Sequence, residues 1–154
     1  MAQFISQYWH PAVATDIALY TLRHGELNLL CVKRKDSGEW ALPGGFITKG
    51  ENLDQCAARE LKEEAGVEVP YLQHFANYSD PKRDNRGQVI SVAYVAIHPS
   101  GKLRLKADTD VFDVNWFSTG QIPDLAFDHN KIATDAKRFL AGLVESRPEM
   151  VFAF

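Results

Sequence analysis

The sequence lacks a long hydrophobic run and a secretory signal. Among its 154 residues the longest unbroken apolar stretch is Val92–Ile97, far short of the roughly 20 residues that cross a bilayer. The start, Met1–Ile5, has neither the basic nor the apolar segment of a signal peptide. We therefore expect neither a membrane-spanning nor a secreted protein, but a soluble cytoplasmic one.

The sequence also lacks a basic excess and a cysteine framework. Its 17 basic and 20 acidic residues give a net charge of −3, which argues against direct, sequence-independent binding of nucleic acid. Of its two cysteines, Cys31 stands in an apolar, strand-like run and Cys56 in a helical one, and they lack metal-ligand spacing. They are expected to be small buried residues of a reducing compartment. With 45% hydrophobic residues, this length predicts a single domain over residues 1–154.

The order of elements predicts a mixed sheet between helices. Strands are expected at Ala12–Tyr20, Leu27–Val32, Gln88–Ile97 and Val111–Phe117, with one bent or two short strands in Val67–Tyr78. Helices are expected at Asn52–Ala65, ended by Gly66, and at Asn130–Glu145. The turn-forming segment Pro43-Gly44-Gly45 is expected to interrupt regular structure. This order is typical of an α/β (α+β) protein.

The first predicted helix carries acidic residues on its buried side. At helical spacing, Glu60 and Glu64 fall within the apolar stripe of Leu53, Ala57 and Leu61, with Glu63 next to it. Like charges one turn apart repel each other, and burial disfavours their charged form unless a cation neutralises them. Mg²⁺ binds carboxylate oxygens readily. The helix is therefore predicted to bind a metal ion.

The same stretch resembles the signature of the Nudix hydrolase family, G-x5-E-x7-R-E-U-x-E-E-x-G-U, where U is aliphatic. Every position matches: Gly45, Glu51, Arg59, Glu60, Leu61, Glu63, Glu64, Gly66 and Val67. The resemblance implies the Nudix fold, an α/β/α sandwich with a mixed β-sheet. It also implies hydrolysis of a diphosphate by clustered divalent cations.

Roles for individual residues follow from this resemblance. Glu60, Glu63 and Glu64, with the backbone carbonyl of Gly44, would hold Mg²⁺ or Mn²⁺. The residues with a structural role in the motif would be Gly45, Glu51, Arg59 and Gly66, with Glu51 and Arg59 forming a pair that fixes the loop. Glu63 or Glu60 is a candidate for the general base.

Three further segments resemble the ADP-ribose pyrophosphatase branch. In the loop Tyr78–Gly87, where Asn85 replaces the usual proline, the expected substrate-binding residues are Arg83, Asp84 and Arg86, although the loop could also be merely solvated. The acids of Ala107–Asp110 compete for the role of general base. Leu125–His129 recurs in this branch; alternatively, Asp128 or His129 caps the last helix and Phe127 packs in the core.

The leading hypothesis is therefore an Mg²⁺-dependent ADP-ribose pyrophosphatase that releases AMP and ribose 5-phosphate. One alternative is an ADP-ribose-sensing Nudix domain of a transcriptional regulator of NAD metabolism, whose natural chain would continue past Phe154. Another is a hydrolase of oxidised nucleoside triphosphates.

A homodimer is expected, since ADP-ribose hydrolases of this family commonly form one. The sequence adds apolar side chains near both ends, in Phe4–Trp9 and in Val151–Phe154. Exposed apolar patches mark interfaces. The alternative is that both arms fold back on their own subunit.

Overall fold

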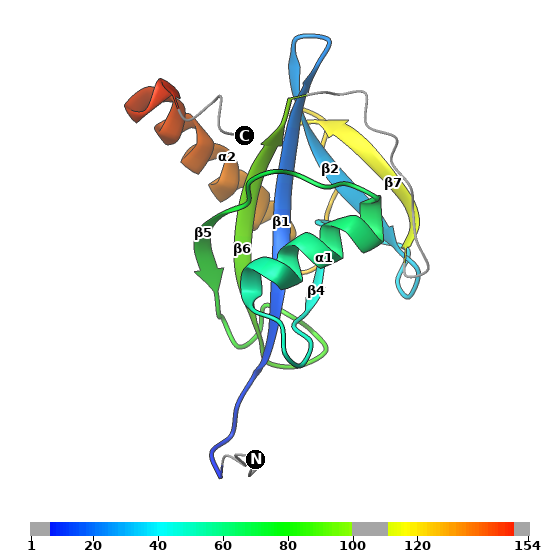
Figure 1. Ribbon diagram of the computed structural model, residues 1–154. Helices are drawn as coiled ribbons and strands as arrows, with labels where there is room; N and C mark the ends of the chain where they lie inside the picture. The colour runs from blue at the N-terminus through cyan, green and yellow to red at the C-terminus, as the bar shows by residue number, and fades with distance from the viewer. Residues whose placement is uncertain (1–6, 100–110, 150–154) are drawn as a thin grey trace.

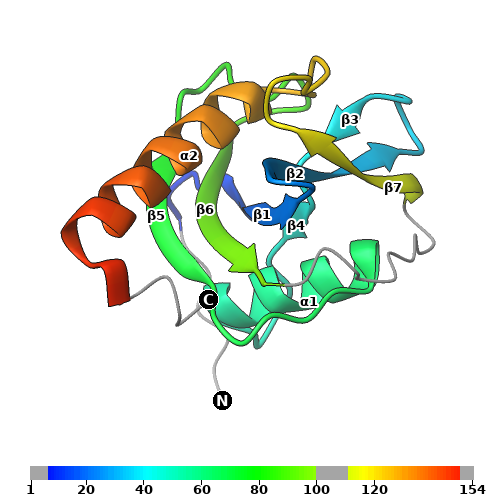
Figure 2. The same cartoon turned by 90° about the horizontal axis from the view of Figure 1, so that it is seen from above.

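A seven-stranded mixed sheet separates two helices in the computed structural model, which describes residues 7–99 and 111–149 (Figure 1). The elements in chain order are β1 (Ala12–Arg23), β2 (Glu26–Arg34), β3 (Trp40–Ala41), β4 (Gly44–Phe46), α1 (Leu53–Ala65), β5 (Gln73–Tyr78), β6 (Val89–His98), β7 (Val111–Ser118) and α2 (His129–Ser146). Viewed from above, α1 and α2 cover opposite faces of the sheet (Figure 2). The predicted sandwich with a mixed sheet is confirmed.

Strand β1 is the centre of the sheet and changes partners along its length. On one edge it pairs in parallel with β6 from Ala12 to Thr21. On the other edge its residues Tyr20–Arg23 pair with β2, while Ala14–Asp16 pair with β4. Strand β2 pairs with β1 only as far as Leu29; it also pairs with β7 from Asn28 to Arg34, and with β3 at Val32 and Lys33. The separation of β1 from β2 makes room for the functional site.

Helix α1 begins and ends as its sequence predicts. The Asn52 side chain accepts a hydrogen bond from the Gln55 backbone N–H, and the Gln55 side chain accepts one from Asn52 N–H, forming a capping box. Gly66 ends the helix in the left-handed conformation at φ 67°, which glycine adopts without a Cβ clash. The buried face of the helix includes Ala57 and Leu61.

Tyrosine hydroxyls connect both helices to the sheet. Tyr20 of β1 donates to the Ala133 carbonyl oxygen of α2 over 2.7 Å. Tyr94 of β6 donates to the Asp54 carboxylate of α1 over 2.6 Å. These bonds satisfy polar groups at the sheet–helix contacts, so both helices have defined positions over the sheet.

Two expectations differ from the structure. Val67–Tyr78 contains one strand only, at Gln73–Tyr78, because Pro70 has no N–H to donate to a ladder. The expected break at Pro43-Gly44-Gly45 instead contains the start of β4. A Cβ on Gly44 would lie 2.1 Å from the Thr15 carbonyl oxygen, so only glycine lets β4 approach β1 this closely.

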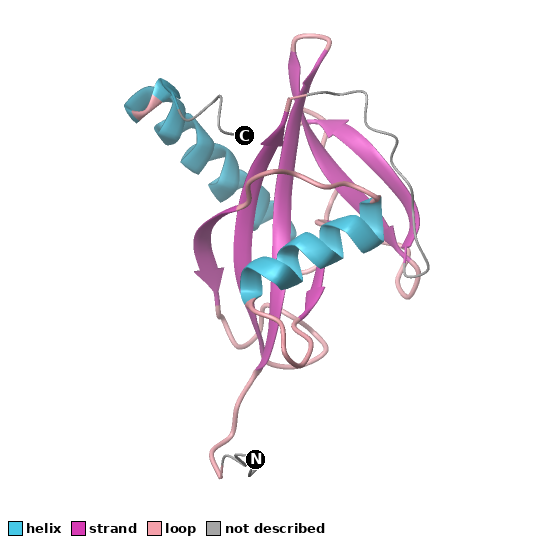
Figure 3. Cartoon of the chain, viewed as in Figure 1, coloured by secondary structure: helices cyan, strands magenta, loops and turns pink. Residues whose placement is uncertain are grey.

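The connecting loops that matter for function lie at one end of the sheet. Figure 3 shows that the loop from β4 to α1 and the loop from β5 to β6 both lie below the strands, at the same end of the sheet. Among the described residues, no helix is both long and apolar enough to cross a membrane.

Candidate active site

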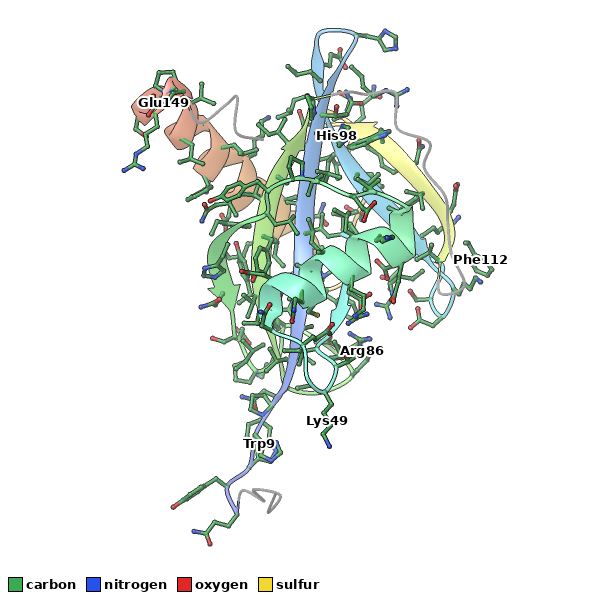
Figure 4. All side chains as sticks on the ribbon, viewed as in Figure 1. Trp9, Lys49, Arg86, His98, Phe112 and Glu149 are labelled. Carbon is green, nitrogen blue, oxygen red and sulfur yellow. The ribbon has the colours of Figure 1, made fainter. Side chains whose placement is uncertain are left out.

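A cavity of about 520 Å³ opens where β1 and β2 separate. It brings together Glu60 and Glu64 of α1 with Arg34 of β2 and Arg86 of the loop before β6. Figure 4 shows Arg86 at the end of the molecule where the β4–α1 loop, marked by Lys49, lies below α1. Acidic and basic groups therefore line the same cavity.

The carboxylates of α1 lie where the helical spacing predicts. Glu60 and Glu64 are half-buried and line the cavity, whereas the Glu63 side chain is 55% exposed. Burial raises the pKa of Glu60, and its hydrogen bond with Arg59 opposes this effect. The fold therefore holds a carboxylate in a position that disfavours its charge.

Arg59 binds three carboxylates at once. Its Nε and Nη2 donate to the two oxygens of Glu51 over 2.9 and 2.6 Å. Its Nη1 donates to Glu60 over 2.7 Å and to Glu63 over 3.1 Å, and Nη2 also donates to the Phe46 carbonyl oxygen. This guanidinium connects the β4–α1 loop to the acidic side of α1.

The backbone of β4 packs directly against these carboxylates. Gly44 N–H donates to Glu64 Oε2 over 2.9 Å. A Cβ on Gly45 would lie 2.4 Å from Glu60 Oε1, so a side chain here would displace that carboxylate. Both glycines are therefore required by close approach of backbone to side chain.

The three residues expected to bind substrate all line the cavity, but they are differently placed. Arg83 has a side chain only 3% exposed, and it forms a two-pronged pair with Asp128 at 2.9 and 2.6 Å. The Asp84 carboxylate is buried and accepts hydrogen bonds from Arg86 Nε and Nη2. Only the Arg86 side chain, 46% exposed, is substantially accessible.

Aromatic rings and guanidinium groups gather at one side of the cavity. The guanidinium carbons of Arg34 and Arg86 lie 4.5 and 4.7 Å from the ring centre of Phe127. Arg86 also lies 5.2 Å from the ring centre of Phe46. These cation–π contacts place apolar ring surface next to positive charge on one side of the cavity.

Of the alternative in which Asp128 or His129 caps α2 and Phe127 packs in the core, the structure confirms Asp128 at the N-cap position but does not place Phe127 in the core. Phe127 is half-buried, lines the cavity and has φ 55°, a conformation that costs a non-glycine residue about 1–3 kcal/mol. The side chain of Asp128 stands at the N-cap but makes no capping hydrogen bond. It binds Arg83 instead, because a buried guanidinium requires a counter-charge.

Sequence reasoning missed a buried polar group formed by Asp16 and His129. Asp16 is in the middle of β1 and lines the cavity, and His129 is the first residue of α2. His129 Nε2 lies 3.4 Å from Asp16 Oδ1. The available signal was an acidic residue, Asp16, within a strand rich in apolar and β-branched residues.

The three carboxylates that are predicted to bind a metal ion contact other groups in this structure. Glu60 and Glu63 face Arg59, and Glu64 faces Gly44 N–H. Within residues 7–99 and 111–149, no three His, Cys, Asp or Glu side chains are grouped so as to hold a metal ion. The competing general-base candidates in Ala107–Asp110 lie outside the described residues.

Comparison with known families and sequences agrees with the geometry. The NUDIX domain family matches residues 10–141. An ADP-ribose pyrophosphatase from Methanocaldococcus jannaschii is 39% identical over 139 residues, covering 88% of this chain and 78% of that protein. The ADPR responsive transcriptional repressor NtrR of Acinetobacter baylyi is 33% identical over 142 residues, covering 85% of this chain but only 55% of the repressor.

A solved structure extends the likeness to three dimensions. The NUDIX domain of Shewanella oneidensis NrtR, crystallised with ADP ribose, superposes with a TM-score of 0.80 at 31% identity. The match covers 86% of this chain and 90% of that domain.

The pairing of Arg59 with Glu51 predicts a pH-dependent contribution to stability. Arg59 is the main cause that lowers the pKa of Glu51 from 4.5 to about 2. A carboxyl whose pKa is lower in the folded than in the unfolded state stabilises the fold above its unfolded pKa. This contribution is lost as the pH falls from about 4.5 to about 2.

We therefore expect Glu51→Gln to lower the free energy of unfolding at neutral pH. The difference between variant and wild type should shrink as the pH falls through that window. Urea denaturation at a series of pH values measures it. A difference that stays constant down to the lowest pH contradicts the assignment.

Proposed function

Since this chain belongs to the Nudix family of hydrolases, we propose that it hydrolyses a nucleoside diphosphate linked to a second moiety. The proposed substrate is ADP-ribose, and the products are AMP and ribose 5-phosphate. One observation carries the proposal: a single cavity joins the carboxylates of α1 to the exposed guanidinium of Arg86 and the rings of Phe46 and Phe127. A diphosphate with an attached base needs both kinds of surface.

The donor set of α1 fits a divalent cation. Glu60, Glu63 and Glu64 offer hard carboxylate oxygens, which Mg²⁺ and Mn²⁺ prefer, and the Gly44 carbonyl would add a fourth oxygen. Bound there, a divalent cation supplies charge neutralisation and a more acidic water. Glu60 and Glu63 would turn from Arg59 to serve as ligands, and we propose Mg²⁺ as the natural ion, with Mn²⁺ able to replace it.

The chain's own residues divide the remaining tasks. Glu63, which is largely exposed, or Glu60, which lines the cavity, accepts the proton of the attacking water. Arg86 contacts the phosphates, and Asp84 orients Arg86 through two hydrogen bonds. Arg83 supports the same loop through Asp128. The position of the β4–α1 loop relative to α1 is fixed by Gly45, Glu51 and Arg59, and Gly66 ends the helix.

A second candidate function is sensing of ADP-ribose. It is favoured by the 33% identity to a transcriptional repressor and by the superposition on the NrtR domain solved with ADP ribose. The net charge of −3 argues against direct binding of nucleic acid by these 154 residues. Binding of ADP-ribose without turnover would favour sensing over hydrolysis.

A substrate panel tests the proposed substrate. ADP-ribose, an oxidised deoxyguanosine triphosphate and NAD are each incubated with the protein and Mg²⁺, and the products are identified by chromatography. We expect the highest kcat/KM for ADP-ribose, with AMP as a product. Turnover of the oxidised triphosphate without release of AMP from ADP-ribose overturns the substrate assignment.

Substitution of the α1 carboxylates tests the proposed chemistry. Glu60→Gln and Glu64→Gln keep the shape but remove the charge, so kcat should fall by about 100-fold or more. Glu60→Gln should keep or raise the unfolding temperature of the metal-free protein, because the fold raises the pKa of that carboxyl.

The matched control for these variants is Glu68→Gln. Glu68 follows α1 and has a side chain 75% exposed, paired with Lys62. Its turnover should equal that of the wild type. Near-normal turnover by both Glu60→Gln and Glu64→Gln refutes the proposed roles.

We further propose a homodimer in the cytoplasm. Two free buried thiols, Cys31 and Cys56, suit a reducing compartment. Tyr8 and Trp9 are 74% and 69% exposed on an arm that projects from the sheet (Figure 4), and such apolar surface favours association. The other apolar residues considered for this contact, Phe4, Ile5 and Val151–Phe154, lie outside the described residues.

Light scattering at micromolar concentration tests the assembly. We expect twice the chain mass of 17.3 kDa, and Trp9→Ser should shift the population toward monomer. A wild-type protein that remains at 17.3 kDa contradicts the dimer.

A further inference from the structure

The loop that leads into β4 has a buried backbone donor that the sheet does not satisfy. β3 ends at Ala41 and β4 begins at Gly44, so Leu42 lies between the two strands. Leu42 is 2% exposed, and a buried N–H without an acceptor is costly. Its acceptor is His129 Nδ1 of α2, 3.0 Å away. A side chain distant in sequence thus completes the hydrogen bonding of this loop.

This contact determines which nitrogen of His129 carries hydrogen. Leu42 N–H can only donate, so Nδ1 must accept and cannot bear a proton. The hydrogen of the neutral ring therefore lies on Nε2, which points at Asp16 Oδ1 over 3.4 Å. The ring accepts a hydrogen bond from Leu42 N–H and turns its other nitrogen toward a carboxylate of β1.

Asp16 is held as a charged acceptor for this ring. Ser91 of β6 donates to Asp16 Oδ2, and Arg83 Nη2 lies 3.7 Å from the same oxygen. Burial alone would raise the pKa of Asp16, but His129, Ser91 and Arg83 together hold it below its ordinary value. A carboxylate facing Nε2 favours the tautomer with hydrogen on that nitrogen.

The loop between β3 and β4 is fixed at three successive residues. Leu42 N–H donates to His129, the Pro43 carbonyl oxygen accepts from Ile17 N–H over 2.8 Å, and Gly44 N–H donates to Glu64. The partners in the last two hydrogen bonds belong to β1 and α1. Only the first comes from α2, so loss of the His129 contact would leave Leu42 N–H unsatisfied while the others remain.

We propose that His129 is a positioning residue for residues Leu42–Gly45, the segment that leads from β3 into the start of β4. It acts as a neutral ring with hydrogen on Nε2. Through this loop it sets the placement of the Gly44 carbonyl and of Glu64, and hence the affinity for a divalent cation. The inference rests on the proposed function, in which both groups are metal ligands. Partners that orient metal ligands in this way commonly change metal affinity when they are replaced.

The tautomer is tested first, on the metal-free protein. Long-range proton–nitrogen correlation spectra of ¹⁵N-labelled protein distinguish a protonated from an unprotonated ring nitrogen. At neutral pH we expect His129 to show hydrogen on Nε2 only. Hydrogen on Nδ1, or on both nitrogens, overturns the proposal whatever the protein's activity.

Two substitutions then separate the two hydrogen bonds of the ring. His129→Asn places an amide oxygen near the position of Nδ1 and keeps an acceptor for Leu42 N–H, but it cannot reach Asp16. His129→Gln reaches the position of Nε2 and keeps a donor for Asp16, but it leaves Leu42 N–H without its acceptor. A purely structural histidine predicts equal effects from both.

Mn²⁺ affinity, measured by electron paramagnetic resonance without substrate, is the readout. We expect His129→Gln to weaken Mn²⁺ binding about tenfold and His129→Asn to stay close to the wild type. His74→Gln, a change of an exposed histidine on β5, is the control and should bind as the wild type does. Thermal unfolding of each variant shows that it is folded.

The outcomes distinguish this inference from its premise. Equal weakening by both His129 variants, or no weakening by His129→Gln, overturns the positioning role alone. A wild-type protein that binds no Mn²⁺ overturns the proposed function, and the positioning role with it.

Discussion

The structure depends on a cluster of four carboxylates, three of which bind one arginine. Glu51, Glu60 and Glu63 all bind Arg59, while Glu64 on the adjacent turn relies on a backbone N–H of Gly44. One guanidinium cannot balance four carboxylates, and two of them are half-buried on one face of a helix. Within the part of the chain that the structure describes, α1 therefore gathers negative charge beside the cavity. The divalent cation that we propose would balance this charge and would account for the carboxylates in the apolar stripe of α1.

The sheet is arranged to place a cavity beside this charge. Because β1 exchanges β2 for β4 at its N-terminal half, a space opens that the carboxylates of α1 and the aromatic–guanidinium surface both reach. Gly44 and Gly45 allow the backbone to pass between β1 and α1 without a clash. The acidic group suits catalysis on a diphosphate, and the cationic aromatic surface suits its recognition. Both groups contact the same short segment, Gly44–Phe46.

Local sequence patterns predicted the parts of the site that are close together in the chain. Helix α1, its end at Gly66 and the inward placement of Glu60 and Glu64 follow from spacing within fifteen residues (52–66). Arg83 contacts Asp16 and Asp128, and Asp16 also contacts His129. These residues lie far apart in the chain, so short-range periodicity could not predict their contacts. Phe127 illustrates the difference. The sequence offered the alternative that Phe127 is a core residue next to the cap of the last helix. In the structure Phe127 has a positive φ and its ring lines the cavity.

The central claim is that the carboxylates of α1 form a cation site. Thermal unfolding of the protein with and without Mg²⁺, at matched ionic strength, tests it most directly. Ligand binding to the folded state alone raises the unfolding temperature, so Mg²⁺ should raise it for the wild type and far less for Glu60→Gln. An equal response of the two proteins, or no response beyond that to NaCl, would contradict the account.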